Sequence, residues 1–141
     1  AHPMDLIAVD AGSVDPGPYY LATRSSFTSL PHVVRDLRIM VEGFLKQQGQ
    51  GHPCKLIVGS AGGCGTDNQL EILTEEVLAM IREIGGQDVA AATKVATVTS
   101  EVTDPAILEG RELTPLGPMP GTVATCMEAA ASAGSDSCAV V

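Results

Sequence analysis

Aromatic and basic residues are both scarce in this chain of 141 residues. It contains no tryptophan, two phenylalanines and two tyrosines, while 45% of its residues are hydrophobic. An interior built mostly from alanine, valine, leucine and isoleucine favours a close-packed α/β domain over a β-sandwich. Eight basic side chains stand against 17 acidic ones, which gives a net charge of −9. Because nucleic-acid binding needs a basic surface, we expect no nucleic-acid partner.

Long hydrophobic runs and paired cysteine motifs are missing too. No apolar run approaches the roughly 20 residues that a membrane-spanning helix needs, so we expect no membrane partner. The four cysteines include no pair at CxxC spacing, which argues against a structural zinc site. We interpret them as free thiols, which are typical of a reducing compartment, and therefore expect a cytoplasmic protein.

Strand patterns and helical periodicities alternate along the chain. Short apolar runs at residues 5–9 and 55–58 and a β-branched run at residues 94–99 predict three strands. Apolar residues at helical spacing predict helices over residues 31–48 and from Thr66 to Gly85-Gly86. A helix after each strand is typical of parallel sheets with right-handed βαβ crossovers. The expected fold class is α/β, a three-layer open, mainly parallel sheet of the Rossmann-like kind.

Polar residues mark where the two long helices begin. Ser29 is the predicted N-cap of the first helix, with Pro31 in its first turn. Thr66 is the predicted N-cap of the second helix, and Gln69 completes a capping box.

The last third of the chain carries weaker patterns. Asp104-Pro105 predicts a short helix through about Gly110. Residues 114–121 predict a loop and residues 122–133 a further helix, before a strand-like run that ends the chain. We interpret residues 1–141 as a single α/β domain whose sheet is incomplete at its C-terminal end. Such a domain would pair with a partner subunit or form a homo-oligomer.

The first candidate site is the loop after the first predicted strand, where residues 10–21 read DAGSVDPGPYYL. Asp10 stands at the carboxyl end of that strand, which is where ligands bind in open parallel sheets. Asp15 supplies a second carboxylate, and Ser13 a hydroxyl donor. Two carboxylates in one crevice could hold a divalent cation or divide the acid and base roles of a reaction. The alternative is a rigid structural turn in which Asp10 caps backbone N–H groups.

The second candidate site is the loop after the second predicted strand, where residues 59–67 read GSAGGCGTD. It has neither the lysine of a P-loop nor the GxGxxG spacing of a dinucleotide fingerprint. A run of backbone N–H donors that leads into a helix N-terminus is a general site for phosphate or carboxylate. Close packing of strand against helix also uses small residues and is the alternative. The predicted substrate- and anion-binding residues of the two loops are Gly12, Gly17, Tyr19, Ser60, Gly62, Gly63, Gly65 and Thr66.

Other reactive side chains give weaker signals. Cys64 lies inside the second loop and could act as a nucleophile, but no histidine is near it in sequence, so a small apolar filler is the better interpretation. The three histidines are interpreted as surface residues.

Taken together, the two loops resemble a known family. Residues 10–21 are similar to the N-terminal motif of the acyclic terpene utilisation A family (AtuA-like proteins), and residues 59–67 are similar to its second motif, at about the expected separation. Family members are considerably longer, so the chain resembles only their N-terminal portion.

The resemblance implies a catabolic enzyme domain with a hydratase or lyase step on an unsaturated branched acyl-CoA or carboxylic acid. One carboxylate would then activate water, and the glycine-rich loop would hold the anionic part of the substrate. Two alternatives stay open. The first is a phosphate- or nucleotide-binding enzyme domain, and the second is a non-catalytic fragment or subunit that needs a partner chain.

Overall fold

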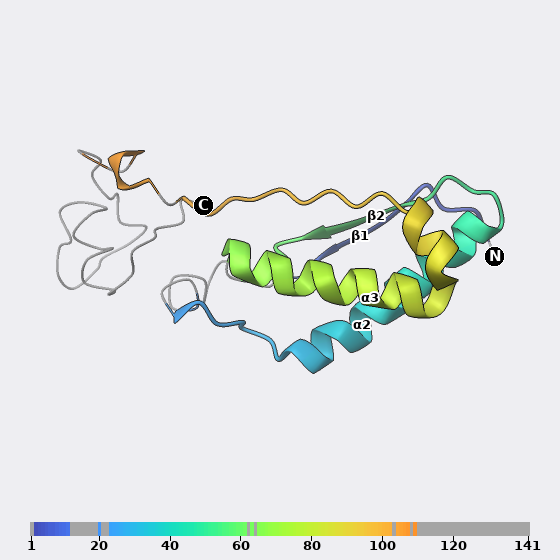
Figure 1. The fold of residues 1–141 in the computed structure, drawn as a ribbon, viewed down its shortest axis with the longest axis horizontal. Helices are drawn as coiled ribbons and strands as arrows, with labels where there is room; N and C mark the ends of the chain where they lie inside the picture. The colour runs from blue at the N-terminus through green and yellow to red at the C-terminus, as the bar shows by residue number, and fades with distance from the viewer. Residues whose placement is uncertain are drawn as a thin grey trace.

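The computed structural model describes residues 2–11, 20, 23–61, 63, 65–102, 104–107 and 109. The described residues form a small α/β fold with two parallel strands and two long helices (Figure 1). Along the chain these elements are β1 (Leu6–Asp10), α2 (Leu30–Gly49), β2 (Lys55–Gly59), α3 (Asp67–Ala92) and a short 3₁₀ helix, η1 (Pro105–Ile107).

The two strands pair in parallel over their whole length. Leu6 lies opposite Lys55, and Asp10 lies opposite Gly59, so both strands end at the same level. One residue beyond β1, the Ala11 N–H donates to the Gly59 carbonyl oxygen over 2.9 Å. The carboxyl ends of β1 and β2 are therefore neighbours, which is the condition for the two predicted loops to open at one edge.

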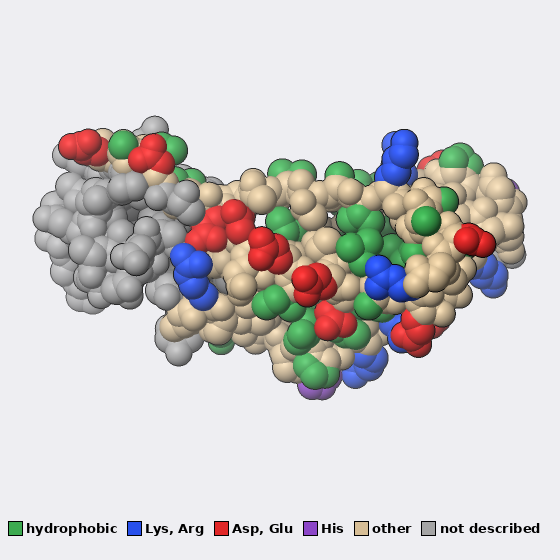
Figure 2. All heavy atoms as spheres, viewed as in Figure 1, with side chains coloured by type: hydrophobic (Ala, Val, Ile, Leu, Met, Phe, Trp, Pro, Cys, Tyr) green, Lys and Arg blue, Asp and Glu red, His purple; other side chains and the backbone are tan. Residues whose placement is uncertain are grey.

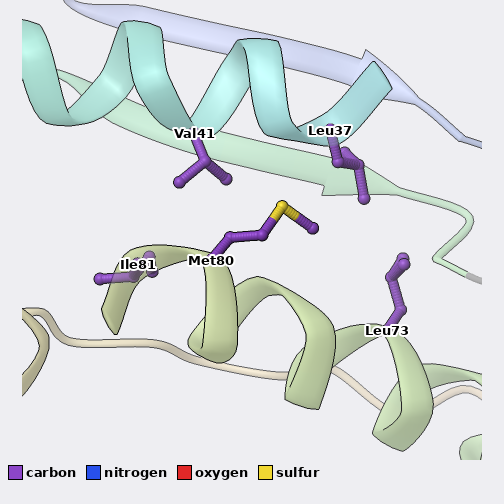
Figure 3. Packing of buried hydrophobic residues seen from close by; sticks show 5 residues of the cluster. All are labelled: Leu37, Val41, Leu73, Met80 and Ile81. Carbon is purple, nitrogen blue, oxygen red and sulfur yellow. The ribbon is translucent and has the colours of Figure 1, made fainter. Parts of the chain in front are cut away.

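The hydrophobic core lies mainly between the two helices, which sit on the same side of the sheet (Figures 1 and 3). Its buried members come from α2 and α3, and the strands add half-buried side chains such as Val9 and Val58. The opposite side of the sheet is open among the described residues, because Leu6 and Ile57 are each about half exposed. The buried cluster consists of Leu37, Val41, Leu73, Met80 and Ile81.

Both predicted N-caps are confirmed, with differences in detail. Ser29 precedes α2, but its hydroxyl bonds to the ring of His32 rather than to a backbone N–H. Thr66 precedes α3 and accepts the Gln69 N–H over 3.4 Å. The Gln69 side chain donates to the Arg24 carbonyl oxygen instead of turning back to Thr66, so it ties the start of α3 to a distant part of the chain.

The predicted third strand is wrong for this structure. Among the described residues the sheet has two strands, and residues 93–102 show no strand pairing, although part of this segment lines the same cavity as β2. β-branched residues favour an extended backbone, but pairing needs a neighbouring edge within hydrogen-bond reach. The β-branched residues of this segment therefore adopt the extended backbone that they favour without joining the sheet.

The predicted end of the second helix at Gly85-Gly86 is confirmed as a break within α3. Gly86 has φ 83° and ψ 172°, which breaks the helix, yet helical residues resume after the kink and continue to Ala92. Glycine adopts such a backbone readily, and the good helix formers that follow it start a new turn.

Farther along, the predicted short helix begins as η1, which ends at Ile107 rather than near Gly110, and Asp104 accepts the Ala106 N–H at its start over 3.0 Å. The predicted loop at residues 114–121, the helix at 122–133 and the final strand-like run lie outside the described residues. Within the described part of the chain, no helix has the length and apolar character needed to cross a membrane.

Candidate functional site

The site predicted from sequence falls at the shared carboxyl edge of β1 and β2. The structure describes Asp10 on one side of this edge, and Ser60, Gly63, Gly65 and Thr66 on the other. The remaining predicted site residues lie outside the described residues: Gly12, Ser13, Asp15, Gly17, Tyr19 and Gly62.

The glycine-rich segment after β2 is a tight turn with left-handed backbone. Ser60 has φ 48°, Gly63 φ 87° and Gly65 φ 82°. The Gly63 N–H donates to the Ser60 carbonyl oxygen over 2.8 Å, which closes the turn. A side chain at Gly65 would be strained by the positive φ, and its Cβ would lie 3.9 Å from the Ser100 hydroxyl. The positive φ, and not a lack of space beside Ser100, therefore favours glycine at this position.

A carboxylate of the chain itself occupies the N-terminus of α3. Glu101 Oε2 accepts the Asp67 N–H over 2.8 Å, and its side chain is only 4% exposed. The positive end of the helix dipole stabilises such an anion. The predicted anion position at this helix end is thus filled from within by Glu101.

Arg24 completes this arrangement from the other side. Its guanidinium lies 3.2 Å from Glu101 Oε1 and is about half exposed. Asp67 Oδ1 is buried at the same helix end, with no hydrogen-bond partner in the described part of the chain. A buried acceptor without a hydrogen-bond partner, such as Asp67 Oδ1, is a place where a ligand hydroxyl or a water would bind.

Sequence reasoning did not single out Arg24 or Glu101. The sequence position of Glu101 could have indicated that it belongs to the site, because Glu101 follows the β-branched run at the predicted carboxyl edge. No sequence feature indicates the same for Arg24, since no neighbouring residue connects it to the start of α3. The ion pair joins residues 77 positions apart in sequence, so only the tertiary structure brings them together.

Asp10 lies in a different, smaller pocket of about 280 Å³ between the end of β1 and the start of α2. Phe27, Thr28 and Asp36 line the same pocket. The ring of Tyr20, which directly follows the first loop's Tyr19, packs edge to face on Phe27 with centroids 5.4 Å apart. Tyr20 therefore lies next to the pocket of Asp10.

Asp36 is the second carboxylate that the structure adds near Asp10. The hydrogen bond from the Arg35 guanidinium, 2.8 Å long, holds the pKa of the Asp36 carboxyl below its usual value. Among the described residues, no group of three or more potential metal ligands occurs. Asp15 lies outside the described residues. A cation held by Asp10 and Asp15 therefore stays a prediction.

A larger groove of about 990 Å³ runs along β2 on the other side of the site. Ser60, Gly65 and Thr66 line it at the carboxyl end of β2, and apolar side chains of α3 such as Leu70 and Val77 line its length. The two groups of predicted residues thus lie on one edge of the sheet but face different cavities, with Asp10 in the small pocket and the glycine-rich turn in the groove.

Comparisons of the chain with protein-family models, with curated proteins and with solved structures find no match. The resemblance to the acyclic terpene utilisation A family accordingly stays a prediction that rests on the two motifs.

Proposed function

We propose that this chain is a catabolic enzyme domain that binds a carboxylic acid or acyl-CoA at the carboxyl edge of β1 and β2 and carries out a hydro-lyase reaction there. The observation that carries the proposal is that β1 and β2 end side by side, with Asp10 opposite Gly59 and the glycine-rich turn directly after it. Open parallel sheets bind their ligands at the carboxyl ends of the strands.

In the proposed reaction Asp10 is the general base. It takes a proton from the water that attacks the β-carbon of the double bond, while backbone N–H donors of the glycine-rich turn stabilise negative charge on the substrate's carbonyl oxygen, and the proton then passes from Asp10 to the α-carbon. Ser13 and Ser60 are the proposed hydroxyl donors, and Asp15 the partner of Asp10 in acid–base or cation chemistry. The adjacent carboxyl ends of β1 and β2 support this division of roles. It requires a substrate that reaches from the pocket of Asp10 to the groove beside the glycine-rich turn.

Asp10→Asn tests the proposal, with Asp5→Asn as its matched control. Both residues are exposed aspartates at the ends of β1, where Asp10 is the last residue of the strand and Asp5 directly precedes its first. We expect Asp10→Asn to abolish hydration of an unsaturated acyl-CoA or acid while the far-UV circular dichroism stays unchanged, and Asp5→Asn to retain activity. Loss of folded structure in Asp10→Asn would assign Asp10 to a structural turn instead.

A phosphate- or nucleotide-binding domain is the second candidate. It is favoured by the positive φ angle of Gly65 directly before the N-terminus of α3, since glycines in this conformation let a backbone N–H turn toward a phosphate. Thermal unfolding with acyl-CoA thioesters, short dicarboxylates and adenine nucleotides with Mg²⁺ separates the two, because a ligand of the native state raises the melting temperature. A shift with inorganic phosphate and nucleotides but not with carboxylates would replace the first candidate by the second.

The fold of the complete enzyme is part of the proposal. We propose a three-layer, Rossmann-like sheet, in which the open side bearing Leu6 and Ile57 is covered by a partner subunit or a second copy. Parallel sheets are normally covered on both faces, which supports this arrangement. A reducing cytosol is the proposed location, and the buried free thiol of Cys54 is compatible with it. Association visible in light scattering tests the covering of the open side.

A further inference from the structure

The outer edge of β2 borders the large groove. In the described residues β2 pairs with β1 along one edge, and its other edge faces this cavity. The far wall of the groove is the chain that follows α3, chiefly residues 93–98. In Figure 2 this segment crosses the molecule above a hollow in which hydrophobic side chains are visible. An open strand edge is a template for a further strand.

Residues 94–99, named the strap below, have the sequence of a strand. They read KVATVT, and four of the six are β-branched. In the open position Val98 is 86% exposed and Val95 44% exposed. A strand-forming segment that leaves its valines in water gains free energy if it finds an edge to pair with.

Both ends of the strap are already anchored. At the near end, the Thr93 N–H and hydroxyl both donate to the Val89 carbonyl oxygen at the end of α3. At the far end, Glu101 binds the first N–H of α3 and the Arg24 guanidinium. Because the loop is closed at both ends, moving the strap sideways adds little further loop-closure entropy.

The strap also runs in the correct direction. It leaves α3 beside the start of β2 and ends where Ser100 approaches Gly65, beyond the carboxyl end of β2 (Figure 1). It therefore runs parallel to β2, and α3 serves as the crossover helix that parallel neighbours require.

We propose that the strap closes onto β2 as a third parallel strand, which fills the groove, with Glu101 as its fixed far end. The strap then has two states: an open state, which is the extended and unpaired one in the structure, and a closed state in which it is paired with β2. Closing would pair the outer edge of β2 and bury one of the two strap valines against the apolar wall of α3, while the other points to the opposite face of the sheet. The inference does not depend on the proposed enzymatic activity.

Amide hydrogen exchange of the full chain, followed residue by residue by NMR, tests the proposal. In a parallel edge strand only alternate residues bond to the neighbour. We expect every second amide of the strap to exchange about tenfold or more slowly than an unstructured chain, together with protection of the β2 amides that face the groove. Unprotected exchange along the whole strap, while amides in the β1–β2 ladder stay protected, would overturn the proposal.

Proline substitutions at two successive strap positions supply matched variants. The N–H groups of Ala96 and Thr97 would point to opposite sides of a closed strap, so only one of them faces β2. We expect the proline at that position to remove the protection of the strap and of the groove-facing β2 amides. The other proline should leave both in place, because an edge strand tolerates proline on its outer side. Equal behaviour of the two variants, with the β1–β2 ladder intact in each, would also overturn the proposal.

Discussion

Two successive segments of this chain follow the same plan and end differently. From β1 the chain passes through α2 and returns as β2, which pairs fully with β1. From β2 the chain passes through α3 and returns as the strap, which lies beside β2 without pairing. α2 packs on both β2 and α3, whereas α3 packs chiefly on α2. Because α3 packs on α2 rather than on the sheet, the strap that follows α3 is not brought to the outer edge of β2.

The stability of the protein should depend more on the first crossover, β1–α2–β2, than on the second. The largest loss of stability is expected for Leu37→Ala. Leu37 is 3% exposed in the cluster between α2 and α3. Removing a buried leucine side chain costs about 2–5 kcal/mol of unfolding free energy. Urea unfolding followed by circular dichroism measures it. Ile39→Ala, on the same helix but 68% exposed, is the control and should change stability by about 0.5 kcal/mol or less.

The second crossover has its own weak point at Gly86. Its backbone, at φ 83° and ψ 172°, is open almost only to glycine, and no atom lies within 4 Å of an added Cβ. Gly86→Ala should therefore cost about 1–3 kcal/mol through backbone strain alone.

Gly49→Ala is the control for this substitution. It also meets nothing within 4 Å, and its φ is not positive, so it should be neutral or slightly stabilising. Equal unfolding midpoints for the two alanine variants would show that the kink does not depend on glycine.

A smaller effect is expected at the far anchor of the strap. Glu101→Gln keeps an acceptor for the Asp67 N–H but loses its charge opposite Arg24. Since Arg24 is half exposed, we expect a loss of only about 0.5–1 kcal/mol, which shrinks as salt is added. Glu109→Gln makes the same charge change at an exposed position and serves as the control. A salt-independent loss would mean that the charge pair contributes nothing.

The smallest effect concerns Asp36 on the outside of the first crossover. Its pKa is lowered in the folded protein by the hydrogen bond from Arg35. The stability that this contributes is present above the unfolded-state pKa, near 4, and is lost as the pH falls through the folded-state value. Because both side chains are exposed, the change in stability should be slight. An NMR titration of the carboxyl should show its pKa rise toward the usual value in Arg35→Ala, and an unchanged titration would contradict the assigned cause.

Much of the local structure could be predicted from the sequence. The two short apolar runs became β1 and β2, with ends shifted by one residue, and Ser29 and Thr66 precede the helices that they were predicted to cap. These features depend on neighbours in sequence, such as the spacing of apolar residues and the first turn of a helix. The third strand failed because β-branched residues specify an extended backbone and not a partner.

The candidate site was likewise predictable from the sequence only in part. That two glycine-rich segments follow two strands is readable from the sequence, and the strand ends from which they start are neighbours in the structure. The separation of Asp10 from the groove and the filling of the α3 N-terminus by Glu101 were not predictable. Both depend on contacts between residues far apart in the chain.

The sequence by itself therefore determined which segments are helical, which are extended and where the turns need glycine, because these preferences act over a few residues. Only the tertiary structure decided which extended segments pair, which carboxylate occupies the start of α3 and which cavity each candidate residue faces. Those outcomes follow from how α2 and α3 pack on each other, and packing is set by the whole chain at once.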